Sequence, residues 1–192
     1  MFLSPSRAKS FWPKFSSLTR RTPRRPGVSL YEAIVAQARS ETFYRELGVP
    51  DTVHGRFEMI VLHVALVLAR LGLEGEAGQR TGRTMLEAFV ADMDDACRRL
   101  GIGDMGVPRH VKKAAAAVLE RSNTYHAAMA GGAERNGLAA VLASEIWEGP
   151  VESAPGAEPL ADYVRRTVAS LERQDGAGLL AGNVDFPELP AV

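Results

Sequence analysis

The chain has 192 residues, and its 23 basic and 23 acidic side chains give a formal net charge of zero. A composition of 46% hydrophobic and 24% charged residues is typical of soluble globular proteins, and the length favours one domain, with or without tails. The single cysteine, Cys97, excludes an intramolecular disulfide framework and a zinc site of the CxxC type. No apolar run approaches the roughly 18 residues that a membrane span needs.

The charges are unevenly distributed along the chain. Residues 1–27 carry a net charge of plus seven, residues 28–144 minus one, and residues 145–192 minus six. The first segment lacks acids and is rich in serine and proline, which predicts a flexible arm. It has no apolar stretch for a secretory signal, but it fits a mitochondrial transit peptide or an arm that contacts anionic lipid or RNA. The cations of this predicted membrane or ribosome contact are Arg7, Lys9, Lys14, Arg20, Arg21, Arg24 and Arg25.

Helix signals follow the arm. Ser29 and Glu32 have the spacing of a capping box, which predicts a first helix that ends near Ser40, and a short helical turn is expected over residues 42–47. Thr52 or Asp51 is then expected to cap a longer helix over about residues 55–71. Apolar residues recur every three or four positions in that helix, which indicates burial on one side.

Four further helices are predicted in the second half of the chain. They cover about residues 78–100, a stretch that starts near Pro108 and ends at Gly131, residues 138–147 and residues 160–171. Beyond residue 174 the glycines and prolines are typical of a tail. The chain is therefore predicted to be an all-α, single-domain bundle of about six helices over residues 28–174, with a basic arm (1–27) and a tail (175–192) that are both disordered.

No motif for catalysis or metal binding is present in the sequence. The four histidines lack HExxH spacing, and neither a phosphate-binding loop nor a nucleophile elbow occurs. Asp92, Asp94 and Asp95 lie on a predicted helix, where a solvated face with interhelical ion pairs is the simpler interpretation than a calcium loop. We therefore expect no enzyme, no cofactor, no metal, no small-molecule substrate and no DNA partner. A metal enzyme would require Asp92, Asp94 and His63 to converge.

The helix over residues 55–71 carries a mixed stripe. Arg56, His63 and Arg70 are spaced seven residues apart, and Met59 and Leu66 lie between them on the same side. Such a stripe can bind an acidic or amphipathic partner helix. Alternatively, the two arginines pair with acids of a neighbouring helix, and the candidates for these acids are Asp92 and Asp94.

A second basic spot lies at the start of the helix that begins near Pro108. It consists of Arg109, Lys112 and Lys113. Cations at this end oppose the helix dipole and cost a few tenths of a kcal/mol. An unfavourable local placement is a weak indication that these residues have a use.

An ordered set of short motifs carries a resemblance to a known family. The motifs are Leu30-Tyr31, Ala33-Ile34-Val35, Gln37-Ala38-Arg39, Phe43-Tyr44, Gly48-Val49-Pro50-Asp51-Thr52, Gly55-Arg56-Phe57-Glu58, Leu62-His63, Arg70-Leu71, Asp92-Met93-Asp94, Gly101-Ile102-Gly103-Asp104, Val107, Lys112-Lys113, Arg121 and Tyr125. Together they resemble the ubiquinol–cytochrome c chaperone family of cytochrome bc complex assembly factors, over roughly residues 29–130.

The resemblance implies an all-helical, non-enzymatic chaperone that binds newly made cytochrome b, and mitochondrial members work with a small partner protein. It implies a bacterial chain at the cytoplasmic side of the inner membrane, or alternatively a mitochondrial matrix protein with a cleaved presequence. The expected partner-binding residues are Arg56, Phe57, Glu58, Met59, His63, Leu66, Arg70, Asp92, Asp94, Asp104, Lys112, Lys113 and Tyr125. The alternative function is a helical ribosome- or RNA-associated module without client contact.

Overall fold

The computed structural model describes residues 25–130 and 135–189, so the basic arm up to residue 24, together with residues 131–134 and 190–192, lies outside the described residues. Within those ranges the chain forms α-helices and one short 3₁₀ helix and contains no strand, which confirms the all-α prediction. In chain order the elements are α1 (Pro26–Ala38), α2 (Glu41–Arg45), α3 (Val53–Gly72), α4 (Gly75–Arg99), α5 (Val107–Ala130), α6 (Arg135–Ile146), η1 (Val151–Ser153), α7 (Ala157–Arg173) and α8 (Gly176–Leu180).

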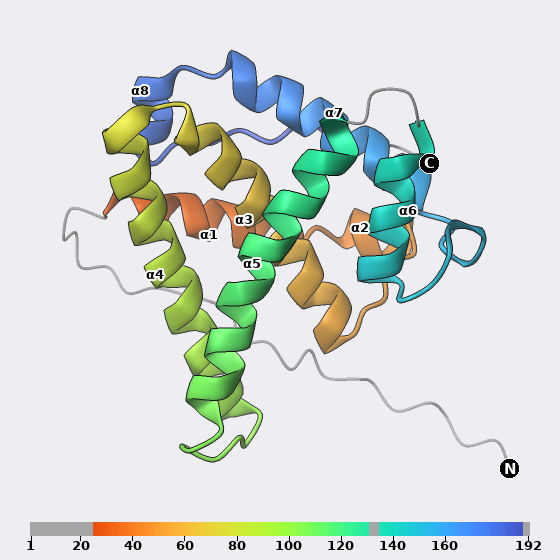
Figure 1. Cartoon of the computed structure of the whole chain (residues 1–192), viewed down its shortest axis with the longest axis horizontal. Coiled ribbons are helices and arrows are strands. Elements are labelled where there is room, and N and C mark those ends of the chain that lie inside the picture. Colours follow the sequence, from red (N-terminus) through yellow and green to blue (C-terminus); the bar gives the residue numbers. More distant parts are fainter. Residues whose placement is uncertain (1–24, 131–134, 190–192) are drawn as a thin grey trace, which may run out of the picture.

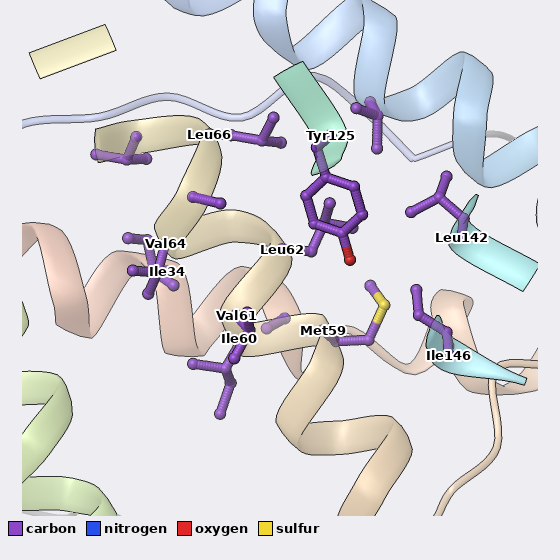
Figure 2. Close-up of a cluster of buried hydrophobic side chains, with 14 of the residues drawn as sticks. Ile34, Met59, Ile60, Val61, Leu62, Val64, Leu66, Tyr125, Leu142 and Ile146 are labelled. Atoms are coloured by element: carbon purple, nitrogen blue, oxygen red, sulfur yellow. The ribbon is translucent and has the colours of Figure 1, made fainter. Parts of the chain in front are cut away.

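Helix α3 lies at the centre of the bundle. Every residue from Glu58 to Val67 is buried, and the helix contacts α1, α4, α5, α6 and α7. Figure 2 shows Ile60 and Val64 extending from one side of α3 and Leu62 from another. The prediction of burial on one side was therefore wrong, because a helix that is apolar all round is covered all round. In the described part of the chain, no helix has the length and hydrophobicity to cross a membrane.

The helix-start signals give one confirmed and one wrong prediction. Thr52 caps α3, since its Oγ1 accepts a hydrogen bond from the Gly55 N–H at 3.1 Å. Helix α1 instead begins at Pro26, so Ser29 and Glu32 lie within the helix and form no capping box at its start. Proline suits a first helical position, because its fixed φ is helical and the missing N–H would have no partner there.

The segment beyond residue 174 is folded, which corrects the prediction of a tail there. It forms α8, with Leu179 buried in the core, and Phe186 and Leu189 pack against that core. The Gln174 side chain holds the returning chain: its Nε2 donates to the Asp185 carbonyl at 2.7 Å, and its Oε1 accepts from the Asp185 N–H at 3.1 Å. Its apolar residues are spaced irregularly among glycines and prolines, so they give no periodic signal in the sequence.

Two long helices, α4 and α5, form an antiparallel pair whose connecting loop projects away from the other helices (Figure 1). The opposite end of α4 is fixed by α1. A Cβ atom added at Gly27 would lie 2.5 Å from both the Met85 nitrogen and the Thr81 oxygen of α4. The approach of α1 to α4 therefore requires glycine at this position.

Gly27→Ala is expected to lower the free energy of unfolding by about 1–3 kcal/mol, because the added methyl group forces α1 away from α4. Gly72→Ala is the matched control, since a Cβ atom there meets nothing within 4 Å. It is expected to leave stability unchanged or to raise it by up to about 1 kcal/mol. Urea denaturation followed by circular dichroism measures both changes, and equal stability of the two variants would contradict the close approach.

Candidate functional site

The stripe predicted on α3 is interior except for Arg56, which is partly exposed. Met59 and His63 have no exposed surface and Leu66 is 3% exposed. Figure 2 shows Met59 among side chains that include Tyr125 of α5 and Ile146 of α6. The stripe is therefore not an accessible face in this structure, because α5, α6 and α7 already cover α3.

His63 lies inside a polar and aromatic cluster. Its Nδ1 lies 2.7 Å from the Met59 carbonyl and its Nε2 lies 2.9 Å from the Tyr163 hydroxyl. A carbonyl only accepts, so Nδ1 carries the proton and Nε2 accepts from Tyr163, whose hydroxyl in turn accepts from the Gln37 amide at 3.0 Å. The rings of Phe43, Tyr163 and Phe186 pack around the imidazole. Burial lowers the pKa of His63 to about 4, so the ring is neutral at pH 7.

Glu58 is buried as one half of an ion pair that joins three helices. The Arg121 guanidinium of α5 donates to both Glu58 carboxylate oxygens at 3.1 and 3.3 Å, and it also lies 2.5 Å from Glu145 of α6. Burial raises the pKa of Glu58, and the hydrogen bonds and charge of Arg121 oppose this rise. The sequence singled out Glu58 but not Arg121 as a site residue, because a pairing across 63 positions leaves no local signal.

Tyr125, another expected partner-binding residue, is 1% exposed and lies one turn beyond Arg121 on α5. Its hydroxyl has no hydrogen-bond partner among the described residues. Burial raises the pKa of this hydroxyl, which is therefore protonated at pH 7. Tyr125 thus contributes to the core rather than to the surface.

Arg70 joins α3 to the end of α7. Its Nε donates to the Leu171 carbonyl at 2.8 Å and its Nη2 to the Gln174 carbonyl at 3.0 Å, while Nη1 pairs with Glu74 at 2.5 Å. Carbonyls at a helix C-terminus have no partner within the helix, and a cation there is favourable. Arg70 is therefore a structural cap for α7, and it pairs with neither Asp92 nor Asp94.

The remaining predicted ion pairs also have other partners. Arg56 binds Asp51 and lies over the ring of Tyr44, with its guanidinium carbon 5.3 Å from the ring centroid. Asp92 accepts from the Tyr31 hydroxyl at 2.8 Å and pairs with Arg99 at 3.6 Å. The prediction that Asp92 and Asp94 pair with arginines of α3 is therefore wrong.

Asp94 and Asp104 share one arginine near the α4–α5 loop. Arg98 pairs with Asp94 at 2.7 Å and with Asp104 at 2.6 Å. Lys112 and Lys113 are exposed on α5, whereas Phe57 is half-buried, with its ring 6.4 Å from that of Phe89. His63 thus lies among aromatic rings, whereas Asp92 and Asp94 pair with arginines of α4, so the three side chains do not converge. Among the described residues, no group of three His, Cys, Asp or Glu side chains could hold a metal ion.

An open groove lies between α3 and α4. It has a volume of about 390 Å³. The lining residues are Leu68, Leu71, Gly72, Gly78, Gln79, Gly82, Arg83 and Leu86. Leucines form its apolar surface. Gly78 and Gly82 are buried and let α4 approach α3 closely, because a Cβ atom at Gly82 would lie 3.1 Å from the Leu68 side chain, whereas a Cβ atom at Gly72 would meet nothing within 4 Å. Gly78 and Gly82 lie one helical turn apart, and this spacing could have pointed to the close contact between α4 and α3 beside the groove.

His63→Gln is expected to flatten the pH dependence of stability. The unfolded chain protonates this histidine near pH 6.5, whereas the folded chain resists protonation down to about pH 4. The stability of the wild type therefore falls as the pH falls through this window, by on the order of 3 kcal/mol from this group. Urea denaturation between pH 7 and pH 4.5 measures the free energy of unfolding of both proteins. If this free energy falls equally with pH in the wild type and in His63→Gln, the assignment of a neutral, buried His63 is wrong.

Arg121→Ala is expected to cost about 3 kcal/mol of stability, because it leaves the buried Glu58 carboxylate unpaired. Arg121→Ala combined with Glu58→Gln is expected to recover part of this loss. Arg45→Ala, which removes one arginine from a pair that is 79% and 83% exposed, is the matched control and is expected to have little effect. Thermal unfolding measures all three, and a loss at Arg121 no larger than at Arg45 would be inconsistent with a buried pair.

The chain is similar to known proteins both in sequence and in fold. A family model described as ubiquinol-cytochrome C chaperone matches residues 45–186. Ubiquinol-cytochrome c reductase complex assembly factor 1 of Homo sapiens is 28% identical over 166 residues, which are 83% of this chain and 53% of the human protein. The protein of the same name from Mus musculus is 28% identical over 79% of this chain and 50% of its own length. The chain thus spans about half the length of these two relatives.

A solved structure has the same fold. The crystal structure of the Cbp3 homolog from Brucella abortus matches with a TM-score of 0.77 and 35% identity, over 85% of this chain and 90% of that one. The family match runs from α2 to Phe186 and includes the segment beyond residue 174. Because the family model covers most of the sequence, from residue 45 to residue 186, the chain belongs to the ubiquinol-cytochrome c chaperone family.

Proposed function

We propose that this chain is a non-enzymatic assembly chaperone that binds newly made cytochrome b and supports assembly of the ubiquinol–cytochrome c reductase complex. The observation that carries the proposal is the family match over residues 45–186. The relatives are named as assembly factors of this complex, and among its subunits we propose cytochrome b as the client. We further propose that the chain acts at the inner face of the membrane that receives this complex.

A binding role also agrees with how the polar side chains are used. The groups that acid–base chemistry would need are already engaged in structural contacts: His63 with Tyr163, Glu58 with Arg121, and Asp92 with Tyr31. General acid–base catalysis needs a group that can reach a substrate proton. His63 and Glu58 are both buried, so neither can reach one in this conformation.

The groove between α3 and α4 is the surface best suited to the client. A hydrophobic helical polypeptide needs an apolar trough, and Leu68, Leu71 and Leu86 provide one. Gly72 on the groove wall is exposed and has no atom within 4 Å of its Cβ position, so a client helix can approach the backbone closely there. Arg83 and Gln79 on its edge offer hydrogen bonds to the polar groups that such a segment exposes.

The role of each predicted contact residue follows from its place. Met59, His63, Leu66 and Tyr125 are buried and act by building the body that carries the groove. The predicted residues with surface left for a partner are Arg56, Phe57, Asp94, Asp104, Lys112 and Lys113. We retain these as candidate contacts outside the groove.

Deleting the gene is expected to lower the amount of assembled cytochrome bc complex while the cytochrome b transcript stays at its normal level. Haem spectra of membranes and native gels measure the complex. When expressed in the deletion strain, the wild type and Ala140→Leu, which adds a leucine at an exposed position of α6, should restore the complex. Gly72→Leu, which adds the same side chain on the groove wall, should not. Normal complex levels in the deletion strain would contradict the proposed function.

A photo-crosslinker at Gln79, on the groove edge, tests the client directly, and the same probe at the exposed Ala36 of α1 is the control. Capture of newly made cytochrome b from residue 79 but not from residue 36 is expected. Capture of ribosomal components alone from residue 79 would favour the ribosome-associated alternative. If Gly72→Leu restores the complex fully, the groove is not the client site, even where the deletion confirms the function.

A further inference from the structure

The loop end of the α4–α5 pair, called here the hairpin tip (residues 100–113), carries apolar side chains without packing partners. Met105 is 98% exposed, the highest value among the large hydrophobic residues described, and Leu100 is 49% exposed. The tip projects away from the other helices (Figure 1). Exposed apolar side chains that stand singly on a surface are ordinary, but two at the outermost point of a projecting hairpin favour insertion into an apolar phase.

Three cations follow these apolar residues in the chain. Arg109, Lys112 and Lys113 are exposed, and none has a hydrogen-bond or ion-pair partner within the described ranges. Arg109 lies in the first turn of α5, where the helix dipole opposes a positive charge, and no acid in that turn offsets it. An anion outside the chain would offset this cost.

The acid of the tip does not neutralise these cations. Asp104, the sole acid of residues 100–113, is bound to Arg98 at 2.6 Å. With His110 neutral, the tip carries a net charge of plus two. The hairpin tip is therefore positively charged, in the same segment that exposes Leu100 and Met105.

We propose that the hairpin tip docks on an anionic lipid bilayer, with Met105 and Leu100 inserted at the interface and Arg109, Lys112 and Lys113 at the level of the headgroups. Apolar side chains that enter the acyl boundary and cations that meet anionic headgroups are the two contributions of interfacial binding. The pattern fits RNA less well. RNA-binding surfaces combine cations with aromatic side chains for base stacking, and apart from His110 the tip has no aromatic ring. The proposal does not depend on the client.

Vesicle co-sedimentation of the full chain tests the docking. The wild type is expected to bind vesicles of phosphatidylcholine with phosphatidylglycerol and to bind pure phosphatidylcholine weakly. Replacing Arg109, Lys112 and Lys113 by Gln should weaken binding at least tenfold, since each cation near an anionic surface contributes about fivefold. In the charge-matched control, Gln replaces Arg45, Arg80 and Arg166, three exposed arginines outside the tip. This control should weaken vesicle binding less than the tip variant does.

The apolar part is tested at Met105 itself. Met105→Ser should weaken binding, whereas Leu73→Ser, at a site 74% exposed at the other end of α4, should not. A polarity-sensitive dye on Met105→Cys, in a Cys97→Ala background, should shift to the blue with the mixed vesicles, and the same dye on Leu73→Cys should not. Because the dye reports insertion at one residue, cations elsewhere in the chain cannot mimic the result.

Two results would overturn the proposal. The first is vesicle binding without a dye shift at residue 105, which would locate the membrane contact elsewhere. The second is binding of poly(U) or ribosomes that requires Arg109, Lys112 and Lys113 but is unaffected by Met105→Ser, with no preference for anionic vesicles. That second result would assign the tip to RNA instead.

Discussion

The structure depends on the burial of α3 on every side. Each fully buried valine, leucine or isoleucine contributes roughly 1.5–3 kcal/mol, and α3 supplies such residues to all of its neighbours. The helices around it cannot replace this contribution. Helices α1 and α6 have 13 and 12 residues, lengths at which an isolated helix is marginal in water. They are helical because packing on α3 and on further helices, α4 for α1 and α7 for α6, covers their apolar faces.

Apolar burial alone does not fix which helix lies where, because it is not directional. The polar residues of α3 provide that information. Glu58 requires Arg121 of α5, His63 requires Tyr163 of α7, and Arg70 requires the carbonyls at the end of α7. A helix displaced by one turn would keep most apolar contacts but leave a buried polar group unsatisfied, at a cost of about 1–3 kcal/mol each. These side chains therefore set the register of the bundle, and this explains why residues expected to bind a partner are interior.

Local signals in the sequence predicted most of the helices and the Thr52 cap, because these depend on neighbouring residues. The arginines of α3 were predicted to pair with acids of another helix, but their actual partners are local. Arg56 pairs with Asp51, five residues before it, and Arg70 with Glu74, four residues after it, so these two pairs could have been predicted from spacing. His63 was a recognisable anomaly in an apolar run, yet its partner Tyr163 lies 100 residues away. The spacing of Gly78 and Gly82 could have predicted the close contact of α4 with α3, whereas the groove beside it depends on how the two helices lie relative to each other.

The two proposed contacts lie at opposite ends of one rigid element. Gly82 lines the groove and Leu100 begins the hairpin tip, so at 1.5 Å per residue they are separated by about 27 Å along α4. A client held in the groove while the tip rests on lipid would be kept in water at a fixed height above the bilayer. Release would then need only a short transfer along the hairpin rather than diffusion through water, where exposed apolar segments aggregate. The hairpin would in this way connect the groove that holds the client to the bilayer that receives it.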